Sequence, residues 1–250
     1  MSNEYLNQCR PLAIEMLNKF NLDELPKVDI IMLSVRPSLI GRIVNNINGQ
    51  KVKPGKVVII LQGYNEQQAR VLKTSVKNCE ELILIHNDDT SVKLGERNNI
   101  ALSHTTADYI AIMDDDDVYY PNYLTSQLSY LKAHGKPAII SKINPIARDE
   151  STRKIGFIRT SFLEGDNRVG AGGSFVFHRE VIESVNGFED IQVGYDSKLM
   201  QAAYKKGYVL LPGDPFNFIV TRGRPEGNTW VIKNATNIHL NNISLEEIEL

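Results

Sequence analysis

Short apolar runs alternate with amphipathic segments along the first half of this chain. The apolar runs have the length and the β-branched content of buried strands. The segments between them carry apolar residues at helical spacing. This alternation predicts an α/β fold with a mostly parallel central sheet that is covered by helices on both faces. The predicted strands are 28–33, 56–61, 82–85 and 109–113, and the predicted helices are 39–47, 66–77, 95–104 and 123–133.

The second half of the chain breaks this rhythm. Residues 141–170 are polar and basic, which indicates a hairpin or loops outside the parallel sheet. A further helix is predicted over 4–20, kinked or restarted at Pro11. We therefore predict an N-terminal helix (1–26), a front half (27–140) and a back half (141–250) of one fused domain. The back half is predicted to contain strands at 174–177, 208–211 and 216–220, and helices at 179–185 and 196–206.

Composition excludes several classes of protein. The 250 residues carry a formal net charge of −2, which gives no indication of a nucleic-acid partner or an anionic membrane. Two cysteines, Cys9 and Cys79, are too few for a disulfide framework or a cysteine-rich zinc site. The first ten residues are polar, and no apolar run approaches the roughly 20 residues that span a bilayer. We therefore expect a soluble cytoplasmic protein without a transmembrane segment.

Four consecutive aspartates, Asp114 to Asp117, follow the predicted strand 109–113 directly. Carboxylates this close together repel one another unless a cation or hydrogen-bond donors neutralise them. Hard oxygen ligands at this spacing suit Mg²⁺ or Mn²⁺, which commonly binds carboxylates together with substrate phosphates. The alternative is a solvated acidic turn that caps the next helix.

Six motifs follow one another in a characteristic order, namely the strand end SVRP (34–37), GERNNIAL (95–102), YIAIMDDDD (109–117) with Pro121, GGS (172–174), GFED (187–190) and GYDSKL (194–199). On these motifs the chain resembles the family-two nucleotide-sugar glycosyltransferases of the GT-A fold from about residue 28 to about residue 230. The resemblance implies an α/β GT-A fold whose front half binds a nucleoside diphosphate sugar and whose back half binds a saccharide or glycoconjugate acceptor.

Two groups of front-half residues suit the nucleotide sugar. Ser34, Val35 and Arg36 follow a strand at the edge where open α/β sheets bind ligands. Ser34 and Pro37 also fit a plain helix start, with a capping hydroxyl and a first-turn proline. Lys93 and Arg97 flank a helix start, where backbone amides and a fixed cation favour a diphosphate. A solvated helix face is the alternative for both.

The second strand departs from the family pattern. Relatives often carry an Asp-Asp-Gly-Ser-like turn here, whereas this chain has Gln62 followed by Gly63, Tyr64 and Asn65. Gln62 offers both a donor and an acceptor to a base edge. A simple turn through Gly63 is the alternative. Because of this substitution, the resemblance does not determine which nucleobase the donor carries.

In the aspartate run, the resemblance equates 114–116 with the family's Asp-X-Asp motif. By this correspondence, Asp116 and Asp114 would coordinate the metal. Asp114 and Asp115 would contact ribose hydroxyls or metal-bound water. Asp117 would cap the helix that starts near Pro121. A shift of the motif by one residue also fits the run.

The back half is expected to bind the acceptor and to supply a base. Gly172 and Gly173 permit close approach of the backbone to a sugar. Asp196 stands where the family has its general base, although relatives place an acid before it and this chain has Tyr195. A helix N-cap is the alternative role for Asp196. Glu189 and Asp190 are alternative bases.

The segment 221–230 is rich in glycine and proline and contains Arg222 and Trp230, the only tryptophan of the chain. Such a loop can close over a diphosphate, with Arg222 neutralising it and Trp230 excluding water at the acceptor side. A solvated turn is the alternative. Many relatives place a histidine metal ligand nearby, but this segment has none, and His239 lies further on.

The resemblance implies a metal-dependent inverting glycosyltransferase, with Mn²⁺ or Mg²⁺ and with uridine diphosphate favoured in the donor. Surface polysaccharide or glycoconjugate synthesis is the implied setting. Two other functions stay open. A nucleotidyltransferase that makes nucleotide sugars would need a Gly-rich phosphate loop after residues 28–33, where this chain has none. A catalytically idle relative could serve as a binding or assembly protein of a surface layer.

Overall fold

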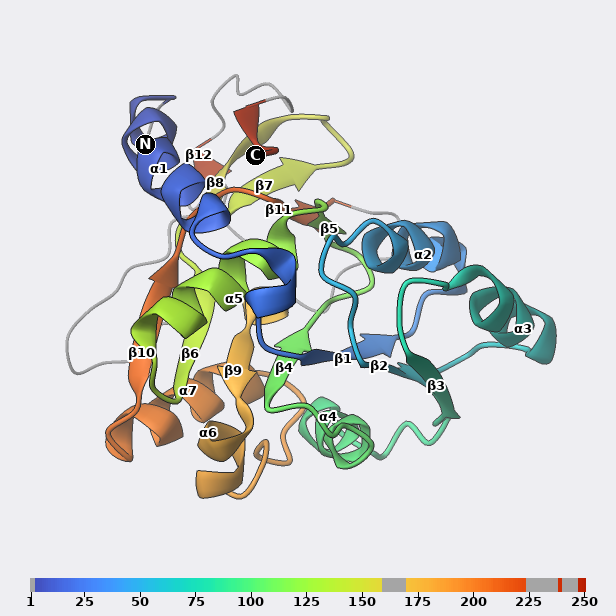
Figure 1. Cartoon of the computed structure of the whole chain (residues 1–250). Coiled ribbons are helices and arrows are strands. Elements are labelled where there is room, and N and C mark those ends of the chain that lie inside the picture. Colours follow the sequence, from blue (N-terminus) through green and yellow to red (C-terminus); the bar gives the residue numbers. More distant parts are fainter. Residues whose placement is uncertain (1–2, 159–169, 224–237, 240–246) are drawn as a thin grey trace.

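The computed structural model describes residues 3–158, 170–223, 238–239 and 247–250. A seven-stranded sheet forms its centre, with the strand order β10-β6-β9-β4-β1-β2-β3 (Figure 1). All neighbouring strands are parallel except β9, which runs antiparallel to β4 and β6. The predicted mostly parallel α/β sheet is therefore confirmed. Its strands are β1 (Val28–Ser34), β2 (Lys56–Leu61), β3 (Glu81–His86), β4 (Tyr109–Ile112), β6 (Ala138–Lys142), β9 (Val176–His178) and β10 (Val209–Gly213).

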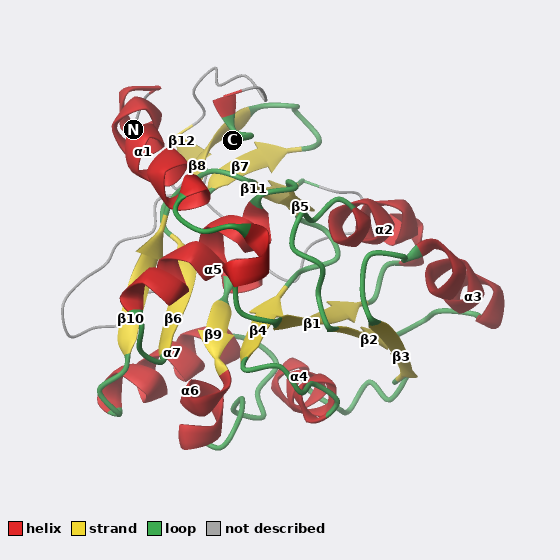
Figure 2. Cartoon of the chain, in the orientation of Figure 1, coloured by secondary structure: helices red, strands yellow, loops and turns green. Residues whose placement is uncertain are grey.

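Helices cover both faces of this sheet because successive strand residues point to opposite sides (Figure 2). In β1, Ile30 and Met32 belong to one buried cluster, whereas Ile31 belongs to another. The first cluster includes residues of α2 (Ile40–Asn48), α3 (Glu66–Ser75) and α5 (Tyr123–His134). The second includes residues of α4 (Leu94–Ser103), α6 (Arg179–Ser184) and α7 (Tyr195–Lys205).

A second sheet of five strands has the order β12-β8-β7-β11-β5. Its strands β7 and β8 form an antiparallel pair, as predicted for a hairpin outside the parallel sheet. Helix α1 (Asn3–Asn18) shares a buried cluster with it, which includes Leu6, Phe157 and Ile219. The strands are β5 (Val118–Tyr119), β7 (Ile146–Asp149), β8 (Ile155–Ile158), β11 (Phe218–Arg222) and β12 (Ile238–His239).

Several boundaries differ from the sequence-based predictions. Helix α1 continues through Pro11 without restarting. The strand predicted from residue 174 begins at Val176, because Gly172–Ser174 forms a 3₁₀ helix, η3. The last predicted strand of the back half, 216–220, is shifted to Phe218–Arg222. Within the described part of the chain, every helix is too short or too polar to cross a membrane.

The carboxyl ends of the parallel strands lie at one edge of the large sheet. Backbone hydrogen bonds continue past the strand ends, from Gln62 N to Ser34 O (2.9 Å) and from Met113 N to Ile31 O (3.1 Å). The loops after β1, β2 and β4 therefore emerge side by side. The aspartate run follows β4 at this edge and leads into β5.

Candidate functional site

Asp115 ties the aspartate run to the loop after β1. Its Oδ2 accepts a hydrogen bond from the Ser34 hydroxyl (2.7 Å), and its Oδ1 accepts from Arg36 Nη2 (2.6 Å). The Ser34 hydroxyl also lies 2.6 Å from the Tyr64 hydroxyl, which donates to Arg36 O (3.2 Å). Ser34, Arg36 and Asp115 were each predicted as part of the nucleotide-sugar site, and the structure brings the three together.

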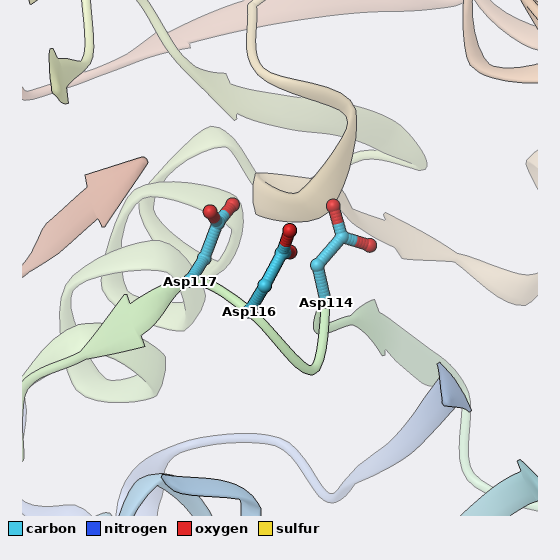
Figure 3. Close-up of side chains that lie close together, drawn as sticks. All are labelled: Asp114, Asp116 and Asp117. Carbon is cyan, nitrogen blue, oxygen red and sulfur yellow. The ribbon is translucent and has the colours of Figure 1, made fainter. Parts of the chain in front are cut away.

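The carboxylates of Asp114, Asp116 and Asp117 form a separate cluster on the turn between β4 and β5 (Figure 3). One oxygen from each lies within 4.8 Å of the others. Arg36 Nη2 approaches Asp116 Oδ2 at 3.1 Å, and Arg222 Nη1 approaches Asp117 Oδ1 at 3.5 Å. The cluster thus contains both predicted metal ligands, Asp114 and Asp116, and adds Asp117.

The predicted capping role of Asp117 is wrong. Helix α5 begins at Tyr123 with Asn122 as its N-cap residue, and no side chain caps it. The Asp117 carboxylate instead accepts a hydrogen bond from Thr221 N (2.9 Å) on β11. Residues 118–119 form strand β5, and the pairing of β5 with β11 brings Asp117 beside Thr221.

Burial and mutual repulsion raise the pKa of two carboxyl groups in this cluster, those of Asp114 and Asp117. Burial, reinforced by the negative charge of Asp116, raises the pKa of Asp114 to about 7. Burial also raises the pKa of Asp117 well above its ordinary value, against the lowering effect of Arg222. Three close carboxylate oxygens with incomplete neutralisation are a donor set that suits a hard divalent cation such as Mg²⁺ or Mn²⁺. The residues present therefore fit the implied metal.

Replacing Asp114 with asparagine should stabilise the metal-free protein at neutral pH. The pKa of Asp114 is about 7 in the folded state and near 3.8 in an unfolded chain. Between these values the folded state binds more protons, so this group lowers stability as the pH rises from about 4 to 7. Asparagine has no proton to lose. Because neighbouring carboxylates share part of the shift, we expect Asp114→Asn to gain about 2 kcal/mol over wild type at pH 8 and less at pH 5.

Urea unfolding with a chelator present, at pH 5 and pH 8, measures this gain. The control is Asp23→Asn, which changes an exposed aspartate in a 3₁₀ turn and should behave like wild type at both pH values. An Asp114→Asn variant that is no more stable than wild type at pH 8 would contradict the electrostatic account.

The 3₁₀ turn η3 lies against the cluster through its two glycines. The Tyr119 hydroxyl donates to Gly173 O and accepts from Asp114 N, both at 2.6 Å. A Cβ atom added to Gly173 would lie 2.5 Å from Asp114 Oδ2, and one added to Gly172 would lie 2.3 Å from Asp196 Oδ2. Any side chain at either position would therefore collide with a carboxylate. The glycines allow the carboxylates of Asp114 and Asp196 to lie directly against the backbone of η3.

Asp196 lies in the first turn of α7, and the predicted N-cap alternative is wrong. The N-cap residue is Gly194, whose φ of 83° is in the left-handed region, and no side chain caps this helix. Asp196 Oδ1 accepts from Ser197 N (2.7 Å). Burial raises the pKa of Asp196 above its ordinary value, and the hydrogen bond from the Ser197 backbone opposes this shift. A partly buried carboxylate with a raised pKa near the cluster is suited to accept a proton.

The loop after β2 meets the start of α4. Arg97, with 4% of its surface exposed, donates from Nη1 to Gln62 Oε1 and from Nη2 to Asp89 O (2.8 Å). Lys93 lies elsewhere, half exposed, with its Nζ 3.6 Å from Asp190 Oδ2. The structure thus brings together two predicted nucleotide-binding residues, Gln62 and Arg97. Lys93 instead pairs with Asp190, one of the alternative candidates for the general base.

Other predicted residues lie apart from the cluster or outside the described chain. Val35 is 44% exposed, and no described contact links its side chain to the aspartates. The backbone of Glu189 packs against Gly95, where a Cβ would lie 1.9 Å from Glu189 O. Trp230 falls outside the described residues. The backbone of His239 pairs with Phe157 of β8.

Four residues of the site were not predicted from the sequence. Tyr64 and Tyr119 supply hydroxyls to Ser34 and Asp114. Arg42 Nη1 donates to Asp116 O (2.6 Å), and the Thr221 hydroxyl donates to the same oxygen. Tyr64 belongs to the atypical turn that begins at Gln62, and this departure from the family pattern was a usable signal. The other three depend on contacts between elements far apart in the sequence.

Comparison with known proteins matches this chain to one protein family. A family model described as glycosyl transferase family 2 matches residues 30–185. EpsE of Bacillus subtilis (strain 168), which carries a provisional glycosyltransferase description, is 27% identical over 110 residues. That match covers 44% of this chain and 40% of EpsE.

Solved structures share the fold at low sequence identity. Residues 1–349 of TarS from S. aureus superpose with a TM-score of 0.61 at 14% identity, covering 78% of this chain and 60% of that one. The same TarS segment with UDP-GlcNAc gives 0.63 at 14% identity, with 81% and 60% coverage. The mannosyltransferase PcManGT from Pyrobaculum calidifontis, with GDP-Man and Mn²⁺, gives 0.60 at 18% identity, with 86% and 63% coverage. The chain thus spans less than two thirds of each of these proteins.

Proposed function

The chain belongs to glycosyl transferase family 2, and on that premise we propose that it transfers a sugar from a nucleoside diphosphate to an acceptor hydroxyl, with inversion at the anomeric carbon. One observation carries the proposal. A cluster of three carboxylates packs against Gly173 through Asp114, and a separate, partly buried carboxylate, Asp196, packs against the adjacent Gly172. The cluster suits a metal and a diphosphate, and Asp196 suits a base.

The donor side is built for a diphosphate. Asp114, Asp116 and Asp117 would hold Mn²⁺ or Mg²⁺, which when bound stabilises negative charge on the departing diphosphate. Arg222 lies beside Asp117, and Arg36 bridges Asp115 and Asp116. These fixed cations favour an anionic ligand. Asp115 and Ser34 form the adjoining hydrogen-bonding edge for the nucleoside.

The acceptor side supplies the proton acceptor. Asp196 takes the proton of the acceptor hydroxyl while that oxygen bonds to the anomeric carbon. The bond from the anomeric carbon to the diphosphate oxygen breaks in the same displacement, and its electron pair leaves with the nucleoside diphosphate. Attack from the face opposite the leaving group inverts the configuration. We assign Gly172 and Gly173 to the acceptor side because, without side chains, they let the carboxylates of Asp196 and Asp114 lie against the backbone there.

The donor and the setting follow from the family and its structural neighbours. TarS is described with UDP-GlcNAc, and PcManGT with GDP-Man and Mn²⁺, so UDP and GDP sugars are the first donors to test. We favour a uridine diphosphate donor and a saccharide or glycoconjugate acceptor. We place the reaction in surface polysaccharide or glycoconjugate synthesis on the cytoplasmic side of the cell.

Release of nucleoside diphosphate from a panel of UDP and GDP sugars tests this proposal. We expect hydrolysis with Mn²⁺ or Mg²⁺ and loss of at least about 90% of it with a chelator, because the metal stabilises the leaving group. A suitable acceptor should raise the rate further. Nuclear magnetic resonance of the product should show inverted anomeric configuration. Equal turnover with and without metal would contradict the metal-dependent mechanism.

Donor binding without turnover would favour the alternative function. A catalytically idle relative would keep the nucleotide site and act in binding or assembly of a surface layer. The partly buried Asp196 beside Gly172 is the observation that favours an enzyme, because a pure binding site has no need of a carboxylate with a raised pKa there.

A further inference from the structure

Helix α2 presents a row of polar side chains where a helix normally buries apolar ones. Arg42 and Asn46 are four residues apart and therefore share one face of the helix, and Gln50 lies just past its end. Asn46 and Gln50 are buried, and Arg42 is partly buried. Polar groups in such positions need hydrogen-bond partners. Gln50 Nε2 donates to Tyr120 O (3.0 Å), in the segment that leads from the aspartate run to α5.

The other two side chains bind the backbone of the aspartate run itself. Helix α2 packs beside β5, which directly follows the run (Figure 1). Arg42 Nη1 donates to Asp116 O (2.6 Å), and Asn46 Nδ2 donates to Asp117 O (2.9 Å). Asn46 Oδ1 also accepts from Tyr119 N (3.1 Å). Two residues on one helix face thus hold successive carbonyl groups of the segment that carries the carboxylate cluster.

Glu150, in the turn after β7, holds Arg42 from the other side. Arg42 Nη2 donates to Glu150 Oε1 (2.9 Å). Glu150 N donates to Arg222 O (2.8 Å), so this turn is fixed against the end of β11. A guanidinium group presents its donors in a rigid fork, so a partner on Nη2 also sets the direction of Nη1. Glu150 therefore orients Arg42, and Arg42 in turn holds Asp116.

The backbone positions of Asp116 and Asp117 determine where their carboxylates lie. One oxygen of each lies within 4.8 Å of the other and of an Asp114 oxygen. A small divalent cation such as Mg²⁺ requires ligand oxygens at about 2.0–2.1 Å in nearly ideal octahedral geometry. A shift of the backbone at Asp116 would therefore disturb metal binding even if every carboxylate were retained.

We propose that Arg42 is a positioning residue for the metal site: oriented by Glu150, it holds the backbone of Asp116 in the conformation that binds a divalent cation. Asn46 holds Asp117 in the same way. The inference rests on the proposed function, because it assumes that the carboxylate cluster binds a metal. It gives a role to a helix that lies outside that cluster. Partners that orient metal ligands typically contribute about 10- to 100-fold to metal affinity.

Electrostatics alone and positioning predict opposite effects when Arg42 is replaced. Removing a positive charge near a cation site should by itself strengthen Mn²⁺ binding, because like charges repel. If Arg42 positions Asp116, Arg42→Met should instead weaken Mn²⁺ binding by about 10- to 100-fold. Arg42→Lys keeps the charge but not the fork, so we expect a smaller loss of affinity. Calorimetric titration of the full chain with Mn²⁺, with and without UDP, measures these affinities.

A double-mutant cycle tests whether Glu150 acts through Arg42. Glu150→Ala removes the carboxylate but leaves the backbone bond to Arg222. We expect it to weaken Mn²⁺ binding by about threefold or more in the wild-type background and to have no effect when Arg42 is already Met. Equal losses in both backgrounds would mean that Glu150 attracts the cation directly, and would overturn its role in orienting Arg42.

The matched control is Arg70→Met, which removes an exposed arginine of α3 and should leave Mn²⁺ affinity unchanged. Thermal unfolding with a chelator present checks the fold of Arg42→Met, in which Asp116 O can still accept from the Thr221 hydroxyl. Wild-type or higher Mn²⁺ affinity in the folded Arg42→Met protein would overturn the inference and leave the proposed function intact. If Arg42→Met does not fold, Arg42→Lys decides in the same way. A wild-type protein that binds no Mn²⁺, with or without UDP, would count against the proposed function itself.

Discussion

The Asp116→Asn variant is expected to lose most of its metal-dependent nucleotide binding. The substitution keeps the size of the side chain but removes one of the charges that would offset a divalent cation. Replacing residues that only support metal ligands typically costs 10- to 100-fold in metal affinity, so loss of a ligand charge should weaken Mn²⁺ binding by at least about 100-fold. Calorimetric titration with Mn²⁺ and UDP, together and separately, measures this loss.

The fold should survive this substitution because Asp116 is anchored through its backbone. Its carbonyl oxygen accepts hydrogen bonds from Arg42 and Thr221, and neither depends on the carboxylate. Arg36 would lose its 3.1 Å ion pair with Asp116 but would keep its ion pair with Asp115. Thermal unfolding close to that of wild type is the control. Unchanged Mn²⁺ affinity in a folded Asp116→Asn protein would remove Asp116 from the metal site.

The fold was predictable from the sequence where a local pattern determined it. The strands 28–33, 56–61, 82–85 and 109–113 all exist, because a buried parallel strand requires a continuous apolar run. The hairpin outside the sheet followed from the polar composition of 141–170. The 3₁₀ turn at Gly172–Ser174 was not predicted. Its two glycines pack against Asp114 and Asp196, and both aspartates are distant from the turn in the sequence.

The candidate site was predictable in residue type but less so in orientation. The run of aspartates predicted a metal site, yet one sequence cannot show which carboxylates converge. The pairing of β5 with β11 turns Asp117 toward Thr221 and so into the cluster. Asp115, which lies inside the run, faces Ser34 and Arg36 instead. The amide of Gln62 likewise acquires its orientation only from Arg97, 35 residues later.

The Asp196→Asn variant is expected to keep donor binding and to lose turnover by about 10²- to 10⁴-fold, the usual contribution of a positioned general base. Asp196 packs against Gly172 and is not one of the three clustered carboxylates, so metal and diphosphate should bind as in wild type. Steady-state kinetics with a fixed acceptor should show a large fall in kcat and a small change in the KM for the donor.

A purely structural role for Asp196 predicts a different result. Asparagine can still accept from Ser197 N, and the helix cap at Gly194 is untouched. Loss of a favourable charge in the first helical turn should cost only about 0.3–1 kcal/mol of stability. Removing a carboxylate whose pKa is raised by burial offsets part of that cost at neutral pH. Thermal unfolding should therefore hardly change, and a fall in turnover cannot be attributed to unfolding.

The pH profile separates catalysis from positioning. A base must be deprotonated to work, so wild-type kcat/KM should fall as the pH drops through the raised pKa of Asp196, and Asp196→Asn should lack this dependence. Asp190→Asn is the matched comparison, because Asp190 is half exposed and paired with Lys93. If Asp196→Asn turns over like wild type while Asp190→Asn does not, the base is Asp190. If neither substitution affects turnover, Glu189 is the next candidate, and a protein without any detectable transfer would then point to binding or assembly.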